Sequence, residues 1–239
     1  MKRFYGSVAL GWEQGGFTVL LDGRPVRTPA RLVLAMPAEG LAEAVAGEWR
    51  QQGEEVDAHA MPLTRLATTA VDLMPARRGD AVAEAAEYAA TDLLCYRASG
   101  PAALARRQAD AWQPWLDWAE RQYDARLVAV SGVMPATQDP IALRALRAAV
   151  ERLDPWRLVG LHAATTLTGS LVLGLAIERG ALTAEAAFDL AMLDEQFEID
   201  QWGEDVEQAA QIARRRDDLL AAGRFLGLLY DAPAGTDTR

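Results

Sequence analysis

The chain begins with short apolar runs separated by turn residues, a pattern typical of β-strands. An apolar run at 17–21 lies between a Gly-Gly pair at 15–16 and an Asp-Gly pair at 22–23, both of which favour tight turns. Pro25 and Pro29 lack the N–H that a central strand must donate, so the segment around them is expected at a sheet edge or in a loop. Residues 1–36 therefore predict a small antiparallel meander.

After this segment the apolar positions recur every three to four residues, which is the period of an amphipathic helix. Pro37 can open a first helix because a missing N–H costs nothing there, and Leu41, Val45 and Trp49 then fall near one face. Gly53 is expected to end this helix. Further helices are expected over 61–73, 80–95 and 101–124.

The C-terminal third is the most plainly helical part of the sequence. Asp139-Pro140 and Asp154-Pro155 each place an N-cap residue before a proline at the first helical position. The helix from 155 is expected to run to about 179, and Thr183 is expected to cap a long helix that reaches about 222. The short link between these two helices predicts antiparallel neighbours.

Residues 158–177 carry no charge unless His162 is protonated, so a membrane span has to be weighed there. The segment also holds three threonines and a serine, and charged residues flank it. We therefore interpret it as a buried helix in a helical bundle, and no membrane insertion is expected.

Together these elements predict an α+β protein, with a small antiparallel N-terminal part followed by a larger, mainly helical part. The chain of 239 residues is long enough for each part to bury a core. The expected domains are 1–60 and 61–230, with a flexible tail at 231–239.

Composition and motifs argue against several classes of function. The formal net charge of −10 disfavours nonspecific binding to nucleic acid. Lys2 is the only lysine, which excludes a Walker-type phosphate loop with its internal Gly-Lys-Ser/Thr. His59 and His162 stand in no zinc or di-iron motif, and Cys95 after two leucines is expected to be a buried structural thiol. No metal or cofactor is expected.

The strongest candidate for function is an acidic stretch at 183–211, which holds nine acidic residues and no basic one. On a helical wheel Asp194, Glu198, Gln201 and Asp205 fall on one side. The core stripe is expected opposite them, at Phe188, Met192, Ile199, Val206 and Ala210. Like charges at this spacing destabilise a helix, so something else must compensate for them.

Two large apolar residues, Leu193 and Phe197, fall among these acids rather than on the core stripe. One interpretation is a solvated acidic face with a second core contact through both residues. The other is a docking surface, in which an acidic rim surrounds an apolar anchor for a basic partner. The sequence alone leaves both open.

An ordered set of segments along the chain resembles one known family. The segments are RFY at 3–5, LDGRPVRTPA at 21–30, LAEAVAGEWRQQ at 41–52, MPLTRLATTAVD at 61–72, TDLLCYRA at 91–98, TGSLVLGLA at 168–176 and LDEQFEIDQWGEDVE at 193–207. They resemble the assembly chaperones of F-type ATP synthase, which hold the free alpha subunit of the catalytic head.

The resemblance implies a chaperone without ATPase activity, and so not an enzyme, whose client is the ATP synthase alpha subunit. It would shield the subunit interface of that client before the beta subunit arrives. The family's emphasis on an acidic C-terminal helix matches this stretch. The expected partner-binding residues are Asp194, Glu195, Phe197, Glu198, Trp202 and Asp205. We expect a monomer in the bacterial cytoplasm, whereas eukaryotic relatives act in the mitochondrial matrix.

Two other hypotheses remain. The chain could be a non-catalytic adaptor for another basic protein, and only the identity of the partner would separate that role from the first. It could also be an enzyme with a carboxylate pair such as Asp194 and Glu198, which would require a deep pocket and a strongly shifted carboxylate pKa.

Overall fold

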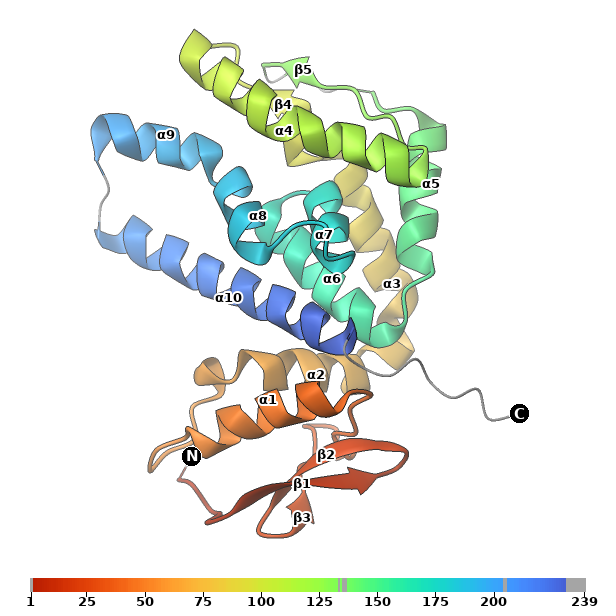
Figure 1. Ribbon diagram of the computed structural model, residues 1–239, viewed down its shortest axis with the longest axis vertical. Helices are drawn as coiled ribbons and strands as arrows, with labels where there is room; N and C mark the ends of the chain where they lie inside the picture. Colours follow the sequence, from red (N-terminus) through yellow and green to blue (C-terminus); the bar gives the residue numbers. More distant parts are fainter. Residues whose placement is uncertain (1, 133, 135–136, 204–205, 231–239) are drawn as a thin grey trace.

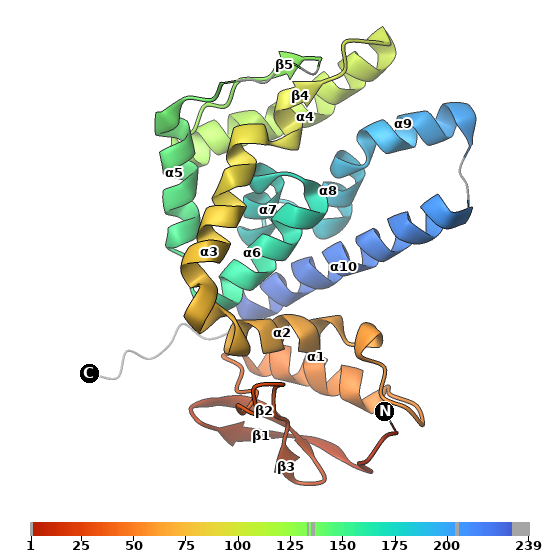
Figure 2. The same cartoon turned by 180° about the vertical axis from the view of Figure 1, so that it is seen from behind.

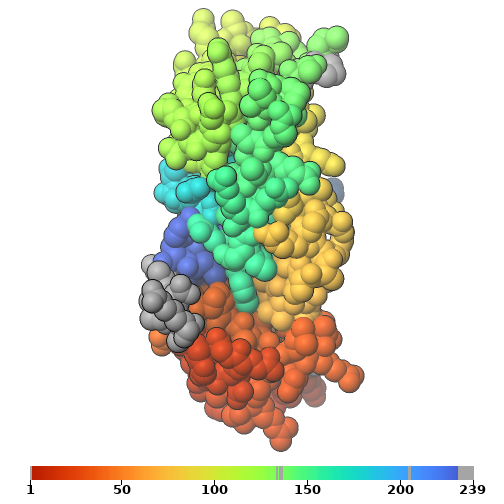
Figure 3. Space-filling model, turned by 90° about the vertical axis from the view of Figure 1, so that its right-hand side faces the viewer, coloured from red at the N-terminus to blue at the C-terminus, as the bar shows by residue number. Residues whose placement is uncertain are grey.

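The computed structural model describes residues 2–132, 134, 137–203 and 206–230. A small antiparallel sheet lies at one end of an elongated molecule, and helices build the rest (Figure 1). A space-filling view from the side shows the N-terminal segment at one end and helix α4 (Ala102–Tyr123) towards the other (Figure 3). The predicted α+β class is confirmed.

The sheet has the order β1-β2-β3, with β1 at Val8–Glu13, β2 at Gly16–Leu21 and β3 at Arg24–Pro25. β1 and β2 pair antiparallel, with Val8 opposite Leu21 and Trp12 opposite Phe17. Both residues of each connecting turn have positive φ, 50° and 80° at Gln14 and Gly15 and 49° and 76° at Asp22 and Gly23. Such turns match the twist of the strands, and the predicted meander is confirmed.

Helix α1 (Glu39–Arg50) covers the sheet and begins two residues after Pro37. Its buried face includes Leu41, Val45 and Trp49, which belong to the same hydrophobic cluster as the buried strand residue Val19. The face predicted from the spacing of apolar residues is therefore the one that packs on the sheet.

The next helices are α2 (Pro62–Asp72), α3 (Met74–Glu87) and α4, followed by α5 (Pro140–Glu151). The expected helix at 80–95 is wrong in its second half, because α3 ends at Glu87 and short 3₁₀ helices follow. The short 3₁₀ helices lie at Ala58–Ala60, Tyr88–Thr91 and Leu93–Cys95. The paired short strands β4 (Tyr96–Arg97) and β5 (Val130–Ser131) are parallel.

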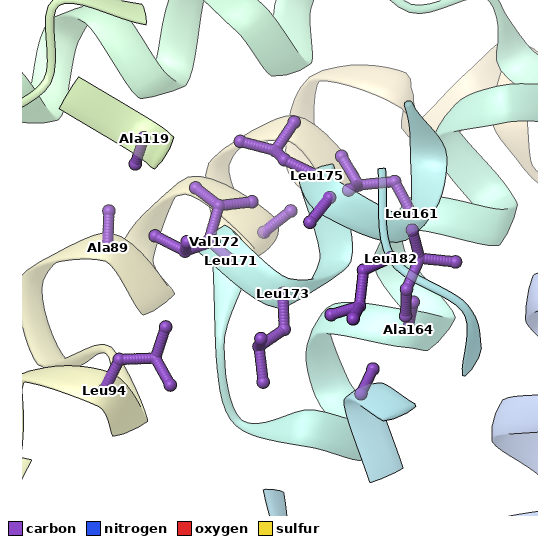
Figure 4. Close-up of a cluster of buried hydrophobic side chains, with 14 of the residues drawn as sticks. Ala89, Leu94, Ala119, Leu161, Ala164, Leu171, Val172, Leu173, Leu175 and Leu182 are labelled. Carbon is purple, nitrogen blue, oxygen red and sulfur yellow. The ribbon is translucent and has the colours of Figure 1, made fainter. Parts of the chain in front are cut away.

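The helix expected from 155 to about 179 is two helices, α6 (Pro155–Thr168) and α7 (Leu171–Glu178). Gly169 ends α6 with φ of 70°, and the Ser170 side chain accepts the Leu173 N–H at 3.0 Å to cap α7. All eight residues of α7 are buried, and its leucines meet α6 and the segments at Ala89 and Leu94 (Figure 4). The predicted burial of this apolar segment is confirmed.

The long helix expected from 183 to about 222 is also wrong. The segment forms α8 (Ala184–Ala191), α9 (Leu193–Trp202) and α10 (Val206–Tyr230), and α10 runs back along the bundle (Figures 1 and 2). The Thr183 side chain caps α8 as predicted, and Gly203, with φ of 83°, follows the last residue of α9. A positive φ is easy for glycine and stops a helix there.

Two clusters of buried apolar residues make the core. One extends from Tyr5 to Ala67 and takes in Phe225 from α10, and the other joins α3 to α10. The domain boundary at residue 60 stays a prediction, and the tail at 231–239 lies outside the described residues. Within the described ranges no helix is long and apolar enough to cross a membrane.

The predicted burial of Cys95 is confirmed, because its side chain has no exposed surface. Burial, with the nearby Asp92 charge, raises the pKa of the Cys95 thiol to about 12, so it is not a nucleophile at neutral pH. His162 is half-buried rather than a core residue, and its Nε2 lies 3.1 Å from Glu84 Oε2.

A candidate protein-binding surface on helix α9

Helix α9 contacts α4 and α8 and leads to the N-terminal end of α10. Together α9 and the first turns of α10 form an arm at the edge of the bundle, visible from both sides (Figures 1 and 2). Five of the six predicted partner-binding residues lie on α9, and Asp205 lies outside the described residues.

The two apolar residues among the acids contact the core. Leu193 is only 4% exposed, and the half-buried Phe197 packs against the main cluster. The interpretation as a second core contact is therefore right for Leu193 and applies in part to Phe197.

The predicted core stripe holds only at its start. Phe188 and Met192 are buried, but Ile199 is half-buried and Val206 is 89% exposed. A helical wheel predicts which side chains share a face only along one continuous helix. Here the helix is interrupted at Met192 and again at Gly203.

Asp194 is part of a buried polar link between α4 and α9. The fully buried Gln108 on α4 donates its Nε2 to Asp194 Oδ1 and accepts the Ala98 N–H at 2.6 Å. Burial raises the pKa of Asp194, and the nearby charges of Glu195 and Glu198 raise it further, while the Gln108 hydrogen bond opposes them. This carboxylate is held by the fold and positions α9.

Arginines from neighbouring helices compensate for two of the α9 acids. Arg215 on α10 places Nη1 3.4 Å from Glu195 Oε1 and donates Nε to the Leu167 carbonyl at 2.7 Å. Arg107 on α4 places Nη1 3.7 Å from Asp200 Oδ2. The acidic run therefore lacks bases in sequence but has them in space, which lowers the like-charge repulsion along α9.

The end of α9 is the most exposed part of the arm. Trp202 is 84% exposed and Val206, at the start of α10, is 89% exposed, the two largest exposures among the large apolar side chains described. Glu198 is also exposed. A tryptophan with this exposure is a side chain that often anchors a protein interface, so the end of α9, here called the tip, is a candidate docking point.

Sequence reasoning missed the residues that hold α9 in place. Gln108, Arg107 and Arg215 are distant in sequence from the acids they contact, and nothing in the local spacing points to them. The sequence did carry a signal for Trp202, an aromatic residue directly before a glycine in an acidic run.

The arrangement on α9 offers a surface for recognition. No group of three or more His, Cys, Asp or Glu among the residues described could hold a metal ion. Asp194 accepts a hydrogen bond from Gln108, whereas Glu198 is exposed on the same helix. Exposed acids beside an exposed tryptophan form the kind of surface that binds a basic protein partner.

Comparison with known proteins identifies the family. The model of a family described as ATP12 chaperone protein matches residues 2–120. A crystal structure of Atp12 from Paracoccus denitrificans is 45% identical with a TM-score of 0.90, and the match covers 95% of this chain and 97% of that one. A protein from Agrobacterium tumefaciens is 42% identical, also with a TM-score of 0.90, over 95% and 86% of the two chains.

A curated relative extends the match to a eukaryote. Protein atp12, mitochondrial, from Schizosaccharomyces pombe is 24% identical over 228 residues, which cover 88% of this chain and 76% of the relative. The resemblance seen in the sequence is confirmed: the chain belongs to the ATP12 family of chaperone proteins.

Proposed function

We propose that this protein is an assembly chaperone for the catalytic head of F-type ATP synthase. It binds the free alpha subunit and shields its subunit interface, without hydrolysing nucleotide, as a monomer in the bacterial cytoplasm. Membership in the ATP12 chaperone family supports the role, and the segments of the resemblance support the client. An exposed subunit interface is an aggregation hazard, and covering it is a stoichiometric binding task.

The observation that carries the binding site is the exposure of Trp202 beside acidic residues at the tip of the α9–α10 arm. Tryptophan often dominates the binding energy of an interface when it enters a pocket of the partner. Exposed carboxylates around it would orient a basic partner and speed the encounter. We therefore assign Glu198 and Trp202 to client contact. Asp205 lies outside the described residues, and we assign it with them on the resemblance alone.

The other three predicted residues have a different proposed role. Asp194 and Glu195 already bind Gln108 and Arg215, and Phe197 packs partly against the core. Their oxygens and ring hold the arm at its angle to α4 and α10, so we assign them to positioning. Substituting them would change the arm itself, so they are poor probes of client contact.

The test is co-expression of this chain with the alpha or the beta subunit of the same organism's ATP synthase, followed by pull-down from soluble extract. The proposal predicts selective recovery of the alpha subunit. Trp202→Ala is expected to weaken recovery by about tenfold or more, as for an interface hot spot. Glu198→Lys should reduce it less, because charges at the rim mainly affect the encounter rate.

Two variants serve as matched controls. Trp12→Ala removes another exposed tryptophan, 62% exposed on the sheet, and Glu120→Lys reverses an exposed charge on α4. Both should recover the alpha subunit as the unmodified chain does. Equal recovery with Trp202→Ala and Trp12→Ala would show that the tip does not bind the client. Recovery of neither subunit would favour an adaptor for another basic partner.

A further inference from the structure

Away from the α9 arm, a groove lies between the N-terminal sheet and the end of α1. It has a volume of about 610 Å³ and is lined by both aromatic and basic residues. Figure 1 shows the sheet at the opposite end of the molecule from α4, and Figure 2 shows the same separation from behind.

The wall of the groove is an aromatic cluster. The Tyr5 ring lies 5.4 Å from the Phe4 ring and 5.6 Å from the Trp49 ring, measured between centroids. Phe4 is 64% exposed, whereas Tyr5 is buried and donates its hydroxyl to the Trp49 carbonyl at 2.7 Å. Arg3 lies over the Tyr5 ring at 4.6 Å. The groove therefore combines a fixed wall with one exposed ring.

The basic side of the groove has spare hydrogen-bonding capacity. The Arg24 side chain forms no hydrogen bond and no ion pair within the described part of the chain, and it lines the groove. Asp22 also lines the groove but forms no ion pair with Arg24, because its Oδ1 accepts the Ser7 N–H at 2.8 Å and the Ser7 hydroxyl at 2.9 Å. These hydrogen bonds, and to a smaller extent the Arg24 charge, lower the pKa of Asp22. Arg27 donates Nη1 to the Arg31 carbonyl and keeps its other donors.

The charge of this region is opposite to that of the whole molecule. Residues 1–36 carry five basic and two acidic side chains, in a chain with a formal net charge of −10. A free guanidinium beside apolar rings suits a carboxylate, since it offers a planar pair of donors to it. A basic groove on an acidic protein indicates an acidic occupant.

The size of the groove limits the shape of that occupant. A helix with its side chains is about 10–12 Å across, so this volume would hold little more than one turn of it. An extended segment of a few residues fits better. One apolar side chain would pack on Phe4 and Trp49, and an adjacent carboxylate would reach Arg24.

We propose that this groove is a second client-binding site, which takes an extended acidic segment of the client protein. The inference rests on the proposed chaperone function for the identity of the client. Two separate sites on one molecule, acidic at the α9 arm and basic at the sheet, would hold one client by avidity. The opposite charges of the two sites would also fix the orientation of the client.

The test uses overlapping 12-residue peptides that cover the alpha subunit, bound to a membrane and probed with the intact chain. Peptides that bind should carry Asp or Glu next to an apolar residue. Fluorescently labelled copies are then titrated with the double variant Arg24→Glu/Arg27→Glu, which should bind about tenfold or more weakly. Binding should also weaken as salt is added.

Control variants separate the groove from net charge and from folding. Arg126→Glu/Arg144→Glu makes the same charge change at exposed sites on the helical part and should leave peptide binding unchanged. Arg24→Lys/Arg27→Lys keeps the charge but loses the planar pair of donors, so it should bind the peptides more weakly than the unmodified chain and more tightly than the Glu variant. If the Glu variant fails to fold, unchanged binding by the Lys variant would overturn the inference. A preference for basic or neutral peptides would overturn the inference, and so would unchanged binding by the folded Glu variant.

Parallel pull-down of the whole alpha subunit distinguishes the two proposals. If the unmodified chain recovers the subunit but binds no acidic peptide, the groove inference is wrong and the proposed function stands. If the chain recovers no alpha subunit and no peptide binds, both are wrong. If acidic peptides bind through Arg24 but the subunit is not recovered, the proposed function is wrong and the groove takes its acidic segment from another protein.

Discussion

At the scale of single residues, buried carboxylates hold the fold together by accepting backbone N–H groups. Glu48 on α1 accepts the Leu63 and Thr64 N–H groups at 2.7 and 2.8 Å, and the Thr64 hydroxyl at 2.6 Å. These N–H groups lie in the first turn of α2 and have no partner within the helix. One side chain therefore caps α2 and joins it to α1.

Replacing Glu48 with glutamine should lower the free energy of unfolding by about 1–3 kcal/mol, because an amide NH₂ would face a backbone donor. The measurement is urea unfolding followed by circular dichroism. Glu43→Gln is the matched control on the same helix, where Glu43 forms an exposed ion pair with Arg50. That control should change stability by less than about 1 kcal/mol. Equal effects of the two substitutions would contradict the capping role of Glu48.

Asp92 plays a similar role at the start of α7, because it too accepts backbone N–H groups. The pH dependence of its contribution to stability can be predicted. Asp92 is fully buried and accepts the Leu94 and Val172 N–H groups, both at 3.1 Å. Burial raises the pKa of Asp92 to about 6, while hydrogen bonds from Ser170 and the backbone oppose the shift. The folded state therefore favours the protonated form, so this group adds most stability at low pH and loses it as pH rises through about 6.

Between pH 5 and 7.5 the stability of the unmodified chain should fall by about 1–2 kcal/mol relative to Asp92→Asn, which has no charge to bury. Urea unfolding of both proteins across this range measures the difference and cancels the titration of all other groups. A difference that stays constant, or that moves in favour of the unmodified chain as pH rises, would show that Asp92 is already ionised in the folded state at pH 5.

At the scale of elements, α10 joins the two hydrophobic clusters. Phe225 has no exposed surface, belongs to the N-terminal cluster and stacks on Trp156 with 6.3 Å between ring centroids. The next residue, Leu226, belongs to the other cluster, and a Cβ added at Gly160 on α6 would lie 2.6 Å from its side chain. Adjacent residues of one helix thus fill different cores.

The two core positions should have separable effects. Phe225→Ala should destabilise the protein by about 3–5 kcal/mol and most reduce amide protection in α1 and the sheet. Leu226→Ala should destabilise it by about 2–5 kcal/mol and most reduce protection in α6. Hydrogen exchange followed by mass spectrometry resolves the segments. If both variants lower protection equally in every segment, α10 does not divide its contacts between two cores.

The elements also show what local sequence can and cannot predict. Caps such as Asp154 and Thr183 act within three residues, so their patterns were sufficient to locate helix starts. The breaks at Gly169 and Gly203 differ from the prediction because each interrupts an otherwise continuous apolar or amphipathic pattern, and such a pattern favours one long helix over a stop at a single glycine. Thr-Gly-Ser at 168–170 did carry a signal, since a glycine C-cap and a serine N-cap stand next to each other there.

At the scale of the whole molecule, the candidate site depends on contacts that sequence spacing does not encode. The acids of α9 were identifiable as a cluster, but Gln108, Arg107 and Arg215 come from α4 and α10. Because of these contacts, the first turn of α9, with Asp194 and Glu195, is fixed to neighbouring helices, whereas the tip at Trp202 is exposed. Only three-dimensional packing makes that division, because it depends on which oxygens already have partners.

The basic and acidic regions of the molecule are separated from each other. The basic N-terminal segment lies at the sheet, and the acidic run lies on α8 and on the arm formed by α9 and the first turns of α10. A client held at both the α9 arm and the sheet would be bound over a long surface rather than in a pocket. Such binding needs no nucleotide cycle, because a competing subunit can displace the chaperone by mass action.

The proposed function requires this chain to keep the free alpha subunit soluble through its α9 tip. The most direct test dilutes denatured alpha subunit into buffer with increasing amounts of this chain and follows aggregation by light scattering, without nucleotide. We expect scattering to fall to a plateau near one equivalent, with Trp12→Ala matching the unmodified chain and Trp202→Ala requiring a large excess. Scattering that no amount of the unmodified chain reduces would contradict the proposed function.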